Sequence, residues 1–129
     1  MPITILVERL LSCFDPFDVL DLDSEKDDPL SCDPIAEFRT FNRRTRRYHH
    51  LGRIHYFINR LLLGEELDPV EIDNACAGRY ILPIPILLDG HHRLCAAVIV
   101  GERTIQANYG GRVDVKNWLS GRRAQRPKE

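Results

Sequence analysis

The joint within residues 84–100 constrains the fold of this chain more than any other feature. An apolar run of strand length, residues 84–88, meets the turn dipeptide Asp89-Gly90, and a helical pattern follows at once over residues 91–100. Pro85 inside the run favours an edge strand or leaves one ladder hydrogen bond unmade. A strand that leads directly into a helix is typical of a mixed α/β architecture.

The remaining elements complete this architecture. Residues 53–63 have the strongest helical pattern, since their apolar side chains recur at i, i+3, i+4, i+7 and i+8, and Gly64 follows as a C-terminal cap. The other patterns predict a strand or a short helix at 2–11, a short edge strand at 18–23, a strand at 70–73, a loop at 74–83, a strand at 104–108 and a helix at 113–119 that Trp118 packs onto the sheet. This order, in 129 residues, predicts a single α+β domain with a small mixed sheet flanked by helices.

Charges are segregated along the chain although the net charge is only −1. Residues 15–37 hold nine acids and one base, residues 39–60 hold seven arginines and no acid, and residues 112–128 hold six bases and one acid. Such segregation suits a charged partner, or lets the chain neutralise its own surface. It also divides the chain into an acidic, partly irregular arm (1–37), a core domain (38–121) and a basic, frayed tail (122–129).

The composition excludes several classes of protein. Four cysteines are spread widely without a CxxC pair, which predicts free thiols rather than a disulfide scaffold or a structural zinc site. No apolar run approaches the roughly 18 residues of a membrane span, and the N-terminus lacks the pattern of a signal peptide. These observations predict a cytoplasmic protein with no membrane partner. The oligomeric state does not follow from the sequence.

The first turn of the helix at 91–100 has the residue types of an anion site. The first amides of a helix have no intrahelical partner, and together with the helix dipole they attract phosphate. Gly90 lets the backbone approach an anion, and Arg93 provides a charged fork that matches phosphate oxygens. His91 and His92 point about 100° apart, so only one of them can face a ligand. The alternative is a purely structural turn in which Asp89 caps the helix.

The same residues carry a resemblance to a known family. The stretch P-I-L-L-D-G-H-H-R-L-C-A-A over residues 85–97 resembles the DGHHRxxAA box of the ParB/sulfiredoxin superfamily. Residues 63–72 are similar to the segment that precedes this box in the family, and Gly101 with residues 104–107 resembles its return strand. The resemblance covers roughly residues 53 to 110, and the second box is its most specific part.

The resemblance implies a ParB/sulfiredoxin-like fold whose box binds nucleotide phosphates. Family members bind and hydrolyse CTP, use ATP, phosphorylate serine, or act as nucleases. By motif, Asp89, Gly90, His91, His92 and Arg93 would hold ATP or CTP with Mg²⁺. His91 stands where sulfiredoxins have a reactive cysteine, which argues against sulfinic-acid reduction. The chain also ends before the helix-turn-helix and dimerisation regions of the partition proteins.

Acidic side chains after the main helix extend this hypothesis to a reaction. Glu66 or Asp68 would assist Mg²⁺ or a nucleophile beside His92 and Arg93, in phosphoryl transfer or nucleotide hydrolysis. Solvated acids at a helix end are the alternative.

Two further hypotheses stay open. Arg43, Arg44, Arg46 and Arg47 form the densest basic run, which predicts DNA binding with possible nuclease activity, or a solvated helix face paired with the acidic arm. The arm itself could dock a protein partner without any catalysis. A metal site at His49, His50 and His55 has the wrong spacing for helical ligands.

Overall fold

The computed structural model describes residues 1–37 and 43–128, so Arg39 and the predicted domain boundary at residue 38 lie outside the described residues. The chain forms two compact units. We call them the sheet unit (residues 1–14, 68–90 and from 102 to the C-terminus) and the helical unit (residues 15–67 and 91–101). The predicted combination of a small mixed sheet with helices is confirmed.

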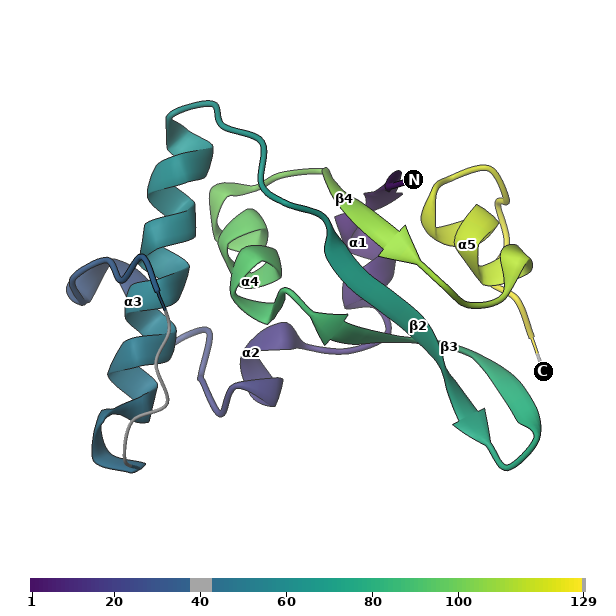
Figure 1. Ribbon diagram of the computed structural model, residues 1–129, viewed down its shortest axis with the longest axis horizontal. Helices are drawn as coiled ribbons and strands as arrows, with labels where there is room; N and C mark the ends of the chain where they lie inside the picture. Colours follow the sequence, from purple (N-terminus) through teal and green to yellow (C-terminus); the bar gives the residue numbers. More distant parts are fainter. Residues whose placement is uncertain (38–42, 129) are drawn as a thin grey trace. The chain divides into compact units, whose positions relative to one another are not determined.

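The sheet unit contains a four-stranded mixed sheet in the order β1-β4-β2-β3 (Figure 1). Its strands are β1 (Ile3–Leu6), β2 (Val70–Ala77), β3 (Tyr80–Asp89) and β4 (Thr104–Tyr109), and its helices are α1 (Val7–Leu11) and α5 (Val113–Leu119). β4 pairs antiparallel with β1 and parallel with β2, while β2 and β3 form an antiparallel hairpin. β3 therefore lies at the edge of the sheet, as the proline at position 85 predicts.

Buried side chains of the sheet unit alternate along its strands. Val70, Ile72 and Asn74 of β2 are buried, as are Ile105 and Ala107 of β4. α1 contributes Val7 and Leu10, and α5 contributes Val115, Trp118 and Leu119 to the buried set. This period of two matches strands with one buried face.

The helical unit contains α2 (Pro16–Val19), the short 3₁₀ helix η1 (Pro29–Ser31), α3 (Arg43–Leu62) and α4 (His91–Val100), with α3 beside α4 (Figure 1). Its core is a cluster of buried side chains: Phe17, Leu22, Leu51, Ile54, Ile58, Cys95 and Ala96. The predicted apolar stripe of the main helix thus packs against α4 and the arm. Within the described residues, no helix is both long and apolar enough to span a membrane.

Three predictions of local structure are wrong. Residues 18–23 form the end of α2 and a turn, because Asp15 accepts a hydrogen bond from the amide of Phe17 (2.9 Å) and caps a helix instead of preceding a strand. Residues 74–83 are no loop but the paired ends of β2 and β3. The tail is not frayed throughout: residues 122–126 are exposed, but Pro127 is buried and Arg9 donates to the carbonyl of Arg123 (2.7 Å). The predicted free thiols are confirmed for all four cysteines.

Candidate functional site

The first turn of α4 presents His91, His92 and Arg93, all of them half-buried. The helix begins directly after Gly90, whose φ of 101° is a left-handed conformation that glycine adopts without strain. No acidic residue lies in this first turn. Basic side chains therefore accompany the first amides of the helix and the positive end of its dipole, as an anion site requires.

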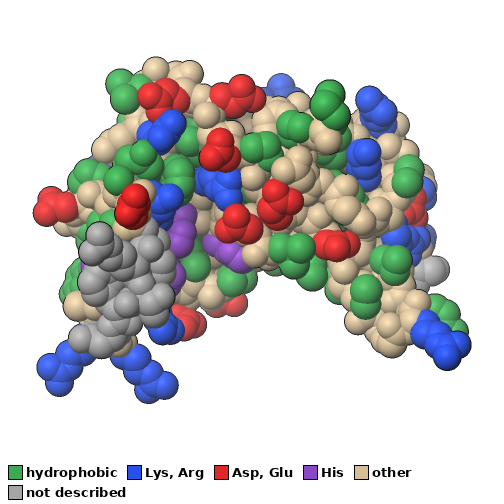
Figure 2. All heavy atoms as spheres, in the orientation of Figure 1, with side chains coloured by type: hydrophobic (Ala, Val, Ile, Leu, Met, Phe, Trp, Pro, Cys, Tyr) green, Lys and Arg blue, Asp and Glu red, His purple; other side chains and the backbone are tan. Residues whose placement is uncertain are grey.

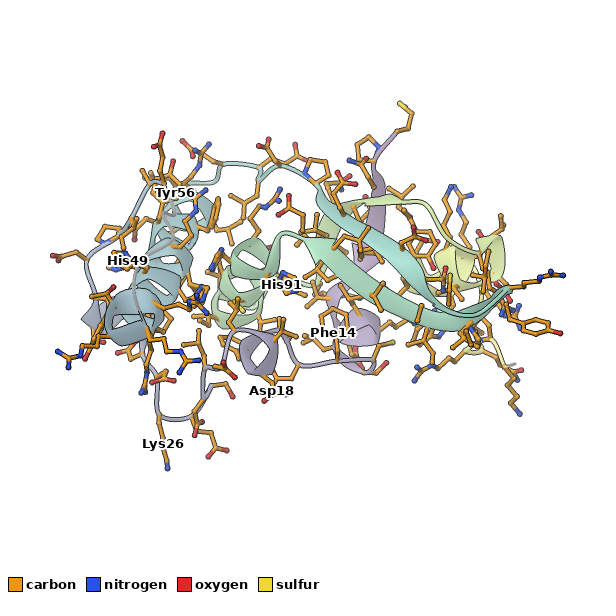
Figure 3. The ribbon with its side chains drawn as sticks, turned by 60° about the horizontal axis from the view of Figure 1, so that its bottom comes forward. Phe14, Asp18, Lys26, His49, Tyr56 and His91 are labelled. Carbon is orange, nitrogen blue, oxygen red and sulfur yellow. The ribbon has the colours of Figure 1, made fainter. Side chains whose placement is uncertain are left out.

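α3 adds a third histidine, His50, beside this turn. The Nδ1 of His50 lies 2.8 Å from the Nε2 of His92, and the two rings stack with centroids 5.1 Å apart. One ring nitrogen of the pair must donate and the other must accept, so at least one of the two imidazoles is neutral while the contact exists. Figure 3 shows the setting of the pair, with His49 on α3 and His91 at the start of α4.

Arg53 of α3 lies close enough to Arg93, in the same unit, for their charges to interact. Burial lowers the pKa of Arg53 and the positive charges of Arg93 and Arg60 lower it further, whereas Tyr56 and Glu37 oppose this shift. The Arg53 guanidinium stacks over the rings of Tyr56 (5.1 Å) and Phe57 (4.4 Å). It also donates to the carbonyl oxygen of Ala36. Like charges are thus held near one another on a face that α3 and α4 share, and a bound anion would relieve their repulsion.

The charge state of His50 depends on its surroundings in the helical unit. Burial lowers its pKa from the ordinary value of 6.5, the positive charge of Arg46 lowers it further, and Asp21 opposes them. His49 and His91 also lower it. The folded state therefore favours a neutral His50 at neutral pH, as the contact with His92 allows.

This lowered pKa predicts a loss of stability on acidification. Between the lowered pKa and 6.5 the unfolded chain binds more protons than the folded chain, so the free energy of unfolding falls as the pH drops below about 6.5. In urea-unfolding experiments, we expect the free energy of unfolding of His50→Gln to decrease less between pH 7.5 and 5.5 than that of the native protein. His55→Gln is the control, because it leaves His50 and its neighbours in place. An unchanged decrease in His50→Gln would contradict the assignment.

The other predicted site residues are divided between the two units. Asp68, Asp89 and Gly90 belong to the sheet unit, whereas Glu66 belongs to the helical unit, in the exposed turn after α3. The neighbouring Glu65 pairs with Arg60 (2.7 Å). The roles of Glu66 and Asp68 stay predictions.

The histidines of α3 serve separate contacts. His55 Nδ1 lies 2.6 Å from the carbonyl oxygen of Cys32 and donates to it, whereas His50 meets His92. Across residues 1–37 and 43–128, no three His, Cys, Asp or Glu side chains gather where they could hold a metal ion.

The predicted nucleic-acid residues lie at the start of α3. Arg43, Arg44, Arg46 and Arg47 are exposed there, and Figure 2 shows basic side chains projecting at this end of the helix. Arg47 forms an ion pair with Asp27 of the acidic arm. The predicted pairing of the basic face with the arm is thus present at Arg47, while DNA binding by this run stays a prediction.

The sequence indicated His50 only as a possible metal ligand, and it did not single out Arg53. They stand three positions apart on α3, so they share one helix face, and Arg60 follows seven residues after Arg53. That spacing was visible in the sequence, but nothing in it indicated that this face meets α4.

Searches against family models, curated proteins and solved structures find no match to this chain.

Proposed function

We propose that the chain binds the phosphate groups of a nucleotide, ATP or CTP, at the first turn of α4. The observation that carries the proposal is the gathering of His50, Arg53, His92 and Arg93 around a helix start that has no acidic residue. Guanidinium and imidazolium groups are strong donors to phosphate oxygens. The resemblance of the DGHHR box to nucleotide-binding ParB/sulfiredoxin proteins supports the same ligand.

Arg93 and His92 have different roles in this proposal. Arg93 provides a permanent charge and a fork that can bind two phosphate oxygens. His92 donates from a ring that His50 orients through the 2.8 Å contact. The amides of the same helical turn complete the set of donors.

The reaction class that fits this proposal is Mg²⁺-dependent phosphoryl transfer or nucleotide hydrolysis. Mg²⁺ on a nucleotide takes most of its ligands from phosphate and water, and one or two carboxylates suffice. Glu66, which belongs to the same unit as His92 and Arg93, would provide one. Phosphate release from ATP should fall in Glu66→Gln while ATP affinity is kept, and unchanged release would exclude this role for Glu66.

A ligand series tests the phosphate proposal on the native protein. Calorimetric titration with adenosine, ADP, ATP and inorganic triphosphate should give affinities that rise with the number of phosphates. Inorganic triphosphate should compete with ATP, because the contacts are to phosphate. If adenosine binds as tightly as ATP, the site recognises the base or the sugar and the proposal fails.

A further inference from the structure

A groove of about 400 Å³ lies in the sheet unit, along β1 and α5. It is lined by Pro2, Ile3, Thr4, Lys116, Asn117, Ser120 and Arg122. Its volume is within the range of ligand sites in proteins, but its lining is mostly polar, unlike that of sites for apolar ligands. None of its lining residues is among the residues proposed above for nucleotide binding.

The charge of the groove is positive. Lys116 and Arg122 are its charged residues, and none of the seven lining residues is acidic. In the part of the chain that the structure describes, neither Lys116 nor Arg122 forms an ion pair, whereas Arg112 of the same segment is paired with Asp114 (2.6 Å). A concave surface whose charged lining residues are all cations concentrates anions.

The neutral polar groups of the lining add donors. The Thr4 hydroxyl accepts a hydrogen bond from Gln106 Nε2 (2.7 Å), so its own proton is available to donate to a ligand. The Asn117 amide is a further donor on the same wall. Hydroxyl and amide donors beside Lys and Arg are the usual contacts to phosphate oxygens of nucleic acid.

Basic residues continue from the groove along the C-terminal segment. Arg123, Arg126 and Lys128 follow Arg122 and are exposed, and Figure 2 shows basic side chains gathered over α5 and this segment. Arg126 stacks over the Trp118 ring at 5.3 Å, which holds the segment against α5. Cations repeated along a surface match a ligand whose negative charge repeats along its length.

We propose that this groove binds the phosphodiester backbone of duplex DNA without regard to its sequence. The groove has no aromatic side chain among its lining residues, whereas sites for single strands stack bases on aromatic rings. The available groups are the cations and small donors that contact phosphates, which position a protein on a duplex but do not read bases.

Fluorescence anisotropy with a labelled duplex, measured over a series of salt concentrations, tests the proposal. The variant Lys116→Gln/Arg122→Gln should lose about two phosphate contacts, which reduces the salt slope by about 1.8 and weakens binding tenfold or more in 0.1 M salt. Lys116→Arg/Arg122→Lys keeps the charges and should bind like the native protein. The control Arg79→Gln/Arg103→Gln removes the same charge from exposed positions of the sheet unit and should change the slope much less.

Three results would overturn the proposal. The first is that Lys116→Gln/Arg122→Gln binds the duplex with the affinity and the salt slope of the native protein. The second is an equal loss in the control, because binding would then follow net charge and not the groove. The third is competition by polyglutamate or by a single strand as strong as that by the duplex, which would assign the surface to another polyanion. Thermal unfolding of each variant verifies that the fold is intact.

Discussion

Asn74→Ala is expected to lower the free energy of unfolding by about 3 kcal/mol, because it leaves three polar groups without their partner. Asn74 is buried in β2. Its Nδ2 donates to the carbonyl of Leu82 (2.9 Å), and its Oδ1 accepts from the amide of Arg112 (2.7 Å) and from the hydroxyl of Tyr109. One side chain thus joins β2 to β3, to β4 and to the start of α5.

The surroundings of Asn74 leave no room for a substitute arrangement. A methyl group on Gly111 would overlap the Asn74 Oδ1, so the backbone packs directly against this amide. Burial raises the pKa of Tyr109, which keeps its hydroxyl protonated as a donor. Asn74 itself is buried, so its side-chain contacts are made away from solvent.

Urea unfolding of matched variants measures this effect. Asn108→Ala is the control, since Asn108 lies on the neighbouring strand, is half-buried and donates one side-chain hydrogen bond, to Glu71 (2.8 Å). We expect it to cost about 1 kcal/mol or less. Tyr109→Phe removes a single partner of Asn74, so its loss of stability should lie between those of Asn74→Ala and Asn108→Ala. Equal stability of Asn74→Ala and Asn108→Ala would contradict the account.

Gly52→Ala is expected to destabilise the helical unit by about 1–3 kcal/mol, the usual cost of overpacking. The Cβ would lie 2.6 Å from the carbonyl oxygen of Asp33 and 2.6 Å from Ile35 Cδ1. The amide of Ile35 donates to the Gly52 carbonyl (2.9 Å), so the arm lies directly on α3 at this residue. In an exposed helix the same substitution stabilises by about 1 kcal/mol, so contact with the arm reverses its sign.

Limited proteolysis locates the effect of Gly52→Ala. Trypsin should cleave faster after Lys26 in the variant, because the arm is displaced from α3. Asn59→Ala is the control: Asn59 is exposed on the same helix, so alanine there adds helix propensity without a clash. Native stability and native cleavage rate in Gly52→Ala would show that the arm does not depend on this contact.

The fold was predictable where local patterns dominate. The helix at 91–100 and the strand at 104–108 follow from periodicity and glycine signals, and both are present as α4 and β4. The arm was predictable only in part: Asp15-Pro16 is a helix-capping signal, whereas the pattern over residues 18–23 favours an edge strand.

Long-range contacts explain the misassigned hairpin. Residues 74–83 contain Gly78 and Pro83, which favour a loop, but β3 is an edge strand that tolerates proline, and Asn74 joins it to β2 through Leu82. That hydrogen bond has no local signature. Likewise, the first turn of α4 was predictable as a basic helix start, whereas its partners His50 and Arg53 depend on how α3 packs.

The most direct test of phosphate binding at α4 is calorimetric titration of ATP into the native protein and Arg93→Ala. Loss of a charge-assisted contact to phosphate costs about 1.5–3 kcal/mol, so the affinity should fall roughly ten- to a hundredfold. Arg93→Lys should recover part of it, and Arg79→Ala, which removes an exposed charge in the turn between β2 and β3, should bind like the native protein. Native ATP affinity in Arg93→Ala would contradict the proposed site.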